Sequence, residues 1–235
     1  MLILHVNLLA VDAATEKLSV ALSSGNEIFS FTADAGLRHS ELVMDIVDML
    51  MNKAALKPRD LSGAVCTGGP GSFTGLRIGF TLVKGLALAL GMPFAAIPSL
   101  DSMVRPFFYW PGIAVPVIDA KKGAFFCALY SGGKRLCPDM DATPAEITNA
   151  LIPVPRSPFP ILLIGPGAQM LYEKINELPA EKQPIHGIIP GGPLWGDAVS
   201  LLEIARETSV IEKGGADIFA GPEYIRKSDA ELSLL

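Results

Sequence analysis

Residues 63–90 contain the feature that most limits how this chain can fold, a glycine- and proline-rich turn between two apolar segments. The first segment, Gly63–Cys66, predicts a buried strand, and the second predicts a helix from about Thr74 to Leu90. Glycine permits positive φ angles and close backbone approach in the turn, and proline fixes its own φ. Because Ser72 or Thr74 can cap the helix, the pattern predicts a tight strand-to-helix corner.

The same corner is a candidate anion site, because a helix N-terminus carries partial positive charge and free N–H groups. The residues that would bind a phosphate or nucleotide are Gly69, Gly71, Ser72 and Thr74. The spacing is neither a Walker A loop, which needs Lys-Ser or Lys-Thr after the last glycine, nor G-x-G-x-x-G. The alternative is a structural corner whose glycines let a helix or a second chain pack closely.

The composition predicts a large core and excludes several partners. Half of the 235 residues are hydrophobic, 18% are charged, and the net charge is −5. The mean hydropathy of +0.40 predicts either a large core or an apolar face that another chain covers. No cluster of Lys and Arg occurs, so the chain is a poor candidate for holding nucleic acid alone. The N-terminus has no cleavable apolar leader, and the apolar window Ile78–Ile97 contains Lys84, so we expect a cytoplasmic protein with no membrane contact.

Cysteine and histidine show no metal-binding spacing. The cysteines lie far apart in the sequence, without a C-x-x-C pair, and are expected to be reduced: Cys66, Cys127 and Cys137. The histidines have no i, i+3 or i, i+4 pair: His5, His39 and His186. We therefore expect no metal site.

Two similar successions of elements follow one another along the chain. In the first, strands are expected at 4–11, 18–23, 27–33, 63–66 and 94–97, with helices at 38–52, at 74–90 and from Pro98. A Pro-rich aromatic stretch predicts a boundary near Arg105, giving lobes at 1–105 and 106–235. The second lobe should contain strands at 113–118, 124–130 and 161–164, helices at 143–151, 168–176 and 195–207, and a surface tail from Gly214. Its first strand ends in Asp119, as the first strand of the chain ends in Asp12.

The helix expected from His39 to Met51 has an apolar stripe wider than one core contact requires. Methionine widens it, and methionine is common at adaptable interfaces. A helix lying on a sheet is one interpretation of this stripe, and a face for a partner chain is the other.

The segment Gly69–Gly79, GPGSFTGLRIG, resembles the signature of the bacterial TsaB family, also called YeaZ. Supporting segments fall in the same order along the chain, at 10–16, 38–41, 99–101, 118–123 and 222–226, while 139–193 matches only loosely. The resemblance implies an α/β fold with two ribonuclease H-like lobes, as in the actin, Hsp70 and sugar-kinase superfamily.

The resemblance also implies a function. TsaD transfers threonylcarbamoyl to the adenosine beside the anticodon of certain tRNAs. TsaB is similar to TsaD and looks like a degenerate relative of it that binds and supports TsaD. The ATPase TsaE joins them, tRNA is reached only through the complex, and a homodimer is expected in isolation. The expected partner-binding residues are Arg38, His39, Leu42, Val43, Met44, Ile46, Val47, Ser72, Phe73, Thr74 and Arg77.

The residues agree with a non-catalytic role. Nucleotide-binding relatives use a D-x-G-T turn, whereas this chain has Ala14 at the glycine position after Asp12. The metal-binding histidines of TsaD-like enzymes fall at Ser99 and Met103. We therefore expect no catalytic residue and no cofactor. The alternative is a weak ATPase or kinase using the inter-lobe cleft, with Asp12 and Asp119 on magnesium.

Overall fold

The computed structural model describes residues 6–152, 158–182, 187–190, 197–217 and 219–226. The chain forms two compact units, one with the described residues of Met1–Ser102 and Gly196–Tyr224, the other with those of Met103–Trp195 and Ile225–Leu235. The first boundary lies close to the one expected near Arg105. The end of the chain differs from the expected 106–235 lobe, because the last helix belongs to the first unit. His5, His186 and the expected helix start at Trp195 lie outside the described residues.

The first unit is built on a five-stranded sheet of order β3-β2-β1-β4-β5. Its strands are β1 (Leu8–Asp12), β2 (Lys17–Ser24), β3 (Glu27–Asp34), β4 (Gly63–Gly69) and β5 (Phe94–Pro98). The first three strands pair antiparallel, and β4 is parallel to both β1 and β5. Every residue of β1 and β4 is buried, as expected for central strands covered on both faces.

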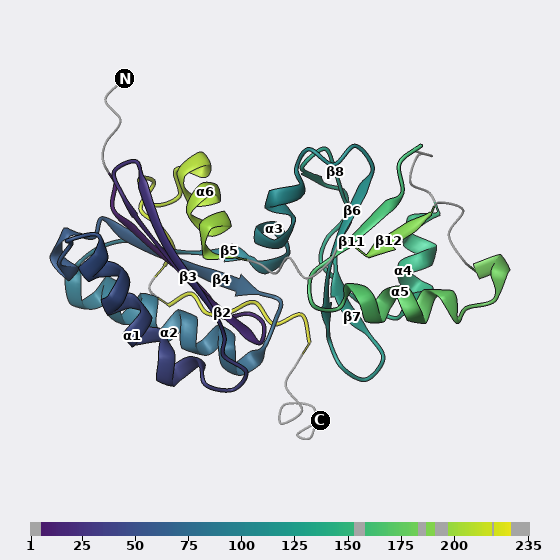
Figure 1. Cartoon of the computed structure of the whole chain (residues 1–235), viewed down its shortest axis with the longest axis horizontal. Coiled ribbons are helices and arrows are strands. Elements are labelled where there is room, and N and C mark those ends of the chain that lie inside the picture. Colours follow the sequence, from purple (N-terminus) through teal and green to yellow (C-terminus); the bar gives the residue numbers. More distant parts are fainter. Residues whose placement is uncertain (1–5, 153–157, 183–186, 191–196, 218, 227–235) are drawn as a thin grey trace. The chain divides into compact units, whose positions relative to one another are not determined.

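Helices cover both faces of this sheet (Figure 1). On one face lie α1 (His39–Lys53) and α2 (Phe73–Leu90), and their inner side chains share a core with Leu9 and Cys66. On the other face lies α6 (Ala198–Thr208), whose Leu201 and Leu202 pack with Leu8 and Val65. The short helix α3 (Ser99–Val104) follows β5, and a 3-10 turn, η1 (Pro58–Asp60), precedes β4.

The second unit repeats the strand order of the first. Its sheet has the order β10 (Met140–Ala142), β7 (Phe125–Cys127), β6 (Ile113–Asp119), β11 (Ile161–Ile164) and β12 (Ile188–Pro190), with β8 (Tyr130–Ser131) on β6 and β9 (Lys134–Arg135) on β8. Its helices are α4 (Pro144–Leu151) and α5 (Ala168–Asn176), with 3-10 turns η2 (Arg105–Phe107) and η3 (Ala180–Lys182). Again three strands pair antiparallel and two continue in parallel. This is the ribonuclease H-like arrangement, so the predicted two-lobed α/β fold is confirmed.

Most predicted elements are observed close to their expected ends. The helix expected at 143–151 is observed as α4 and is capped at its start, because the Thr143 hydroxyl accepts the Glu146 N–H and the Glu146 carboxylate accepts the Thr143 N–H. The strand expected at 124–130 is interrupted between β7 and β8. Strand β12 was not predicted from the sequence. Its three residues show no periodicity, and only pairing with β11 makes them a strand.

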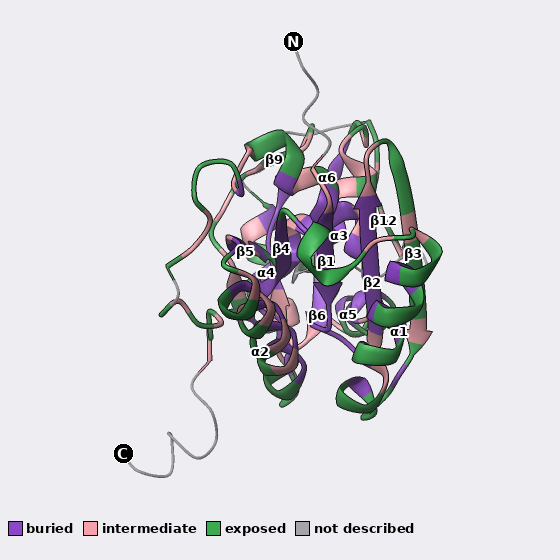
Figure 2. Cartoon of the chain, turned by 90° about the vertical axis from the view of Figure 1, so that its left-hand side faces the viewer, coloured by how far each residue is buried: buried purple, intermediate pink, exposed green. Residues whose placement is uncertain are grey.

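Helix α2 is apolar nearly all round, but its outer side is exposed. Leu76, Phe80 and Val83 are buried against the sheet, whereas Leu88 is 69% exposed. Figure 2 shows exposed residues along the sides of α1 and α2 that face away from the sheet. By length and composition α2 could cross a membrane, and it is the one such helix in the described part of the chain. Its inner side packs as that of a core helix does.

Candidate functional site

The Gly-rich corner between β4 and α2 is filled by the chain's own backbone. A Cβ atom on Gly71 would lie 2.5 Å from the carbonyl oxygen of Ala14, and one on Gly75 would be closer still to that of Ala13. The N–H of Ser72 donates to the Ala14 carbonyl at 2.7 Å. The glycines therefore let the turn after β1 lie directly against the start of α2.

Ser72 caps α2, as predicted, since its Oγ accepts the N–H of Gly75 at 3.2 Å. Thr74 is exposed in the first turn. Gly69 has a φ of +121° and lies against the carbonyl of Glu223. Contacts within the chain thus explain Gly69, Gly71 and the Ser72 amide without a ligand, and phosphate binding at this corner stays a prediction.

The described residues of 216–224, here called the strap, run along the first unit. The Ala216 N–H donates to the Phe94 carbonyl at 2.6 Å, and the Glu223 N–H donates to the Gly68 carbonyl at 2.8 Å. Between them, Lys84 Nζ donates to the Ala220 carbonyl at 2.8 Å. These bonds confirm the predicted surface tail and place it over the end of β4.

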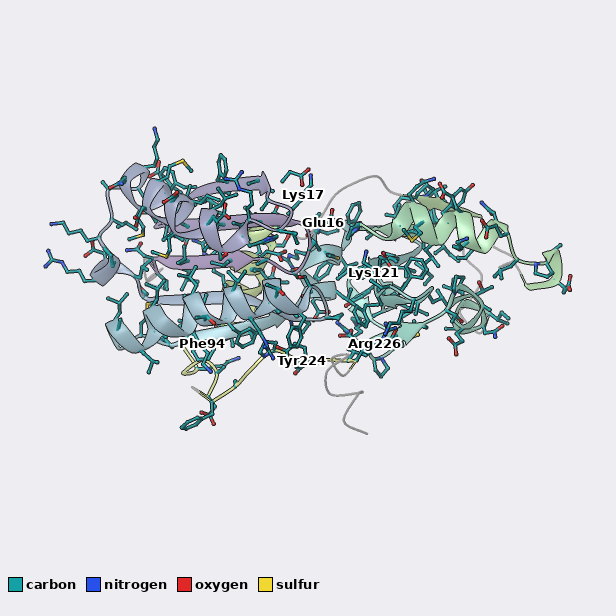
Figure 3. All side chains as sticks on the ribbon, turned by 90° about the horizontal axis from the view of Figure 1, so that it is seen from below. Glu16, Lys17, Phe94, Lys121, Tyr224 and Arg226 are labelled. Atoms are coloured by element: carbon teal, nitrogen blue, oxygen red, sulfur yellow. The ribbon has the colours of Figure 1, made fainter. Side chains whose placement is uncertain are left out.

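The strap brings Tyr224 to the start of α2 (Figure 3). Phe73 and Arg77 lie one helical turn apart on that part of the helix. The ring centroids of Phe73 and Tyr224 are 4.9 Å apart. The guanidinium carbon of Arg77 lies 3.8 Å from the Phe73 centroid, and its Nε donates to Tyr224 Oη at 3.1 Å. Sequence reasoning did not include Tyr224 in this site; its only signal was the 222–226 segment of the resemblance.

The outer sides of α1 and α2, here called the outer face, expose large apolar side chains. Met44 is 44% exposed and Phe73 is 37% exposed, and Met49 and Leu88 are exposed as well. Polar residues such as Asp45, Asp48 and Thr81 lie among them. An apolar centre with interspersed polar groups is the composition of a protein–protein interface.

The structure separates the predicted partner-binding residues into two groups. The exposed or half-buried ones are Arg38, Leu42, Met44, Ser72, Phe73, Thr74 and Arg77. The others are buried on the sheet side of α1: His39, Val43, Ile46 and Val47. These four follow the i, i+4, i+7, i+8 spacing of one helix face, so the breadth of the stripe comes from the outward methionines added to a normal core face.

His39 connects α1 to the turn after β1. Its Nε2 lies 2.9 Å from the carbonyl oxygen of Thr15, and the side chain is buried. Because a carbonyl can only accept, Nε2 carries the proton. In the isolated chain this histidine is a structural link and is not accessible at the surface.

The two strand-end aspartates have different environments. Asp12 is 3% exposed, its Oδ1 accepts the Ala14 N–H, and burial raises its pKa to about 6. In the other unit, partial burial of Asp119 is outweighed by hydrogen bonds from the Lys121 N–H and ammonium, which lower its pKa. One carboxylate is therefore desolvated, and the other is paired with a neighbouring lysine.

No three His, Cys, Asp or Glu side chains among the described residues lie close enough to share a metal ion. The described chain does contain the partners of both strand-end aspartates, and these are backbone amides and a lysine. The exposed groups described above that could contact a partner are therefore the apolar side chains of the outer face and the Phe73–Arg77–Tyr224 group.

Comparisons with known proteins agree with this architecture. Residues 33–156, just over half of the chain, match the family model for TsaD, tRNA N6-adenosine threonylcarbamoyltransferase. A Bacillus subtilis protein named tRNA threonylcarbamoyladenosine biosynthesis protein TsaB is 28% identical over 96% of each chain. The Escherichia coli protein of that name is 29% identical over 53% of this chain and 55% of its own.

The solved structure of YeaZ from Pseudomonas aeruginosa has the same fold, with a TM-score of 0.75 at 23% identity over 94% of this chain and 100% of that one. The match over both units confirms that the repeated sheet order is the architecture of this group. The chain therefore belongs to the family that the TsaD model describes, and within it to the TsaB (YeaZ) proteins of tRNA threonylcarbamoyladenosine biosynthesis.

Proposed function

We propose that this chain is a scaffold subunit in tRNA threonylcarbamoylation, which binds and supports TsaD and does not carry out the transfer itself. TsaD modifies the adenosine beside the anticodon, the ATPase TsaE joins the pair, and tRNA is bound only through the complex. The chain works in the cytoplasm in this proposal. The family's place in threonylcarbamoyladenosine biosynthesis is its starting point.

The outer face is the observation that carries the proposal. It exposes Met44, Met49 and Leu88 on two neighbouring helices, and no part of the chain that the structure describes covers these side chains. Covering apolar surface gains about 25 cal/mol per Å² removed from water. Methionine adapts its shape to a partner surface, and Arg38 with its partner Glu41 supplies polar groups beside it.

The environment of the strand-end aspartates supports a non-catalytic role. A carboxylate that binds magnesium must be reachable, whereas Asp12 is only 3% exposed. Ala14 occupies the glycine position of the D-x-G-T turn, and its carbonyl already accepts the Ser72 amide. Contacts within the chain thus occupy Asp12 and the Ser72 amide, two groups that nucleotide binding would need.

A matched pair of methionine variants tests the proposal. Met44→Asp on the outer face should weaken binding to purified TsaD by about tenfold or more, since a charge would be buried at the interface. Met170→Asp is the control, because Met170 is 45% exposed on α5 of the other unit. Isothermal titration calorimetry gives both affinities. No binding by the wild type, or equal losses in the two variants, would contradict the proposal.

Without TsaD, the outer face of one copy packs in this proposal against the outer face of a second copy, forming a symmetric dimer. Analytical ultracentrifugation should show a dimer that Met44→Asp converts to a monomer and that TsaD converts to a heterodimer.

Calorimetry with ATP and magnesium tests the alternative activity. Binding tighter than millimolar that Asp12→Ala abolishes would favour an ATPase or kinase.

A further inference from the structure

Arg77 is held firmly but has no acidic partner within the described residues. Its Nε bonds to Tyr224 and its guanidinium stacks on Phe73, while its Nη groups find no acceptor in the part of the chain that the structure describes. Three other arginines are paired with carboxylates: Arg38 with Glu41, Arg135 with Asp139 and Arg226 with Asp141. Arg206 donates to the Gly25 carbonyl, and Arg59 is exposed on η1. The Nη groups of Arg77 are therefore available to bind a ligand outside the described chain.

The chemistry of that ligand follows from the guanidinium. Arginine presents paired N–H donors in a planar fork that matches a carboxylate or phosphate bidentately. Stacking on Phe73 and the bond to Tyr224 restrict the side chain before any ligand arrives. Part of the entropy cost of binding is thus met in the free chain, which raises affinity through preorganisation.

The strap creates this arrangement. Tyr224 lies 147 residues beyond Arg77 in the sequence, and the strap holds it there through the Glu223 N–H bond to Gly68 and the Lys84 bond to Ala220. The group thus consists of an outer-face helix and a segment from the far end of the first unit.

The surroundings favour a protein carboxylate over a phosphate chain. Phe73 and Tyr224 are each more than a third exposed, at 37% and 39%, and supply apolar ring edges beside the guanidinium. The chain carries a net charge of −5, which opposes a polyanion. Arg77 also lies on the same helix as Leu88 of the outer face, so the partner that covers this face would reach it.

We propose that Arg77, held between Phe73 and Tyr224, receives an Asp or Glu side chain of the protein partner that covers the outer face. This inference rests on the proposed function and deepens it, because it names one contact of the TsaD interface. It makes the strap part of the binding surface, with Tyr224 as a positioning residue for Arg77.

The experiment measures TsaD affinity by calorimetry at low and at physiological salt. Arg77→Gln should weaken binding by about tenfold or more and should reduce its salt dependence, since a charge pair is lost. Arg77→Lys keeps the charge without the fork and should recover only part of the affinity. Tyr224→Phe keeps the ring but removes the hydroxyl, and a loss of about threefold is expected. Arg59→Gln, at an exposed arginine of η1, is the control that should change nothing.

A double-mutant cycle identifies the carboxylate. Asp→Asn and Glu→Gln variants across TsaD are each combined with Arg77→Gln, and one of them should show coupling to Arg77 but none to Arg59. Circular dichroism and unfolding midpoints establish that every variant is folded.

The outcomes separate the two proposals. If Met44→Asp abolishes binding while Arg77→Gln behaves like Arg59→Gln, the carboxylate contact is wrong and the scaffold function stands. If the wild type does not bind TsaD, both are wrong. If Arg77→Gln instead removes affinity for ATP or inorganic phosphate and leaves TsaD affinity unchanged, the ligand of Arg77 is a phosphate and the inference is overturned.

Discussion

The amide of Ser72 donates a 2.7 Å hydrogen bond to the carbonyl of Ala14, and this bond joins the start of α2 to the turn after β1. Nucleotide-binding relatives would have a glycine where Ala14 stands. Here the carbonyl of Ala14 accepts the hydrogen bond of the Ser72 N–H, a donor at the helix N-terminus that could otherwise bind an anion. The corner works as a backbone-to-backbone joint in the first unit.

The joint predicts opposite effects for two glycines of α2. Gly75→Ala would press its Cβ against the Ala13 carbonyl, so it should lower the free energy of unfolding by about 2 kcal/mol. Gly85→Ala meets nothing within 4 Å and should raise it by up to about 1 kcal/mol, because alanine favours a helix. Urea unfolding measures both. Equal effects would show that Gly75 is not in close contact.

The buried Asp12 predicts a pH dependence of stability. Its pKa rises from 3.8 to about 6 on folding, so the native state binds the proton more tightly and this contribution is lost as pH rises from about 4 to 6. Asp12→Asn keeps an oxygen for the Ala14 N–H without a charge. It should match the wild type at pH 4 and exceed its stability at pH 7 by up to about 3 kcal/mol.

Asp119→Asn is the control for this titration, because the pKa of Asp119 is lowered on folding. Its stabilising contribution is present above the unfolded pKa and is lost as pH falls through the folded pKa. The substitution should therefore destabilise the second unit at pH 7 and have no effect in strong acid. Equal pH profiles for both variants would contradict these assignments.

The two sides of α1 predict a contrast between neighbouring positions. Val47 is buried on the sheet side, so Val47→Asp should lower the free energy of unfolding by about 3 kcal/mol or more. Met44→Asp lies on the outer face and should change it by less than about 0.5 kcal/mol. Chemical unfolding of monomeric protein at low concentration measures these effects separately from association. A stable Val47→Asp variant would show that this stripe faces outward.

Lys84 predicts how firmly the strap is held. Lys84→Met removes the donor to the Ala220 carbonyl and keeps a side chain of similar length. Strap amides such as that of Glu223, which bonds to Gly68, should then exchange about tenfold faster with deuterium, while core amides of β4 remain protected. Lys57→Met, at an exposed lysine before η1, is the matched control. Unchanged exchange in Lys84→Met would mean that the bond does not hold the strap.

The sequence was sufficient for elements with local signals. The apolar run before Gly68 predicted β4, and a cap at Ser72 or Thr74 predicted the start of α2. The strand–Asp openings at Asp12 and Asp119 indicated the repeated lobes. Each depends on residues close together in the chain.

Features that depend on distant residues could not be predicted in this way. The contact of Tyr224 with Arg77 spans 147 residues and has no local periodicity. Strand β12 exists through its pairing with β11, and α6 packs with strands from the start of the chain. Nor did composition separate Met44 from Val47, because both are apolar and only the sheet distinguishes the two sides of α1.

The return of α6 to the first unit has a consequence for synthesis on the ribosome. Leu201 and Leu202 cover the side of the sheet that contains Leu8 and Val65. That side therefore stays exposed to solvent until α6 has emerged from the exit tunnel. The second sheet is complete once Pro190 has been added. The half of the protein that is translated first is therefore the last to close its core, and a nascent chain that stalls before Ala198 would present a bare apolar sheet to chaperones.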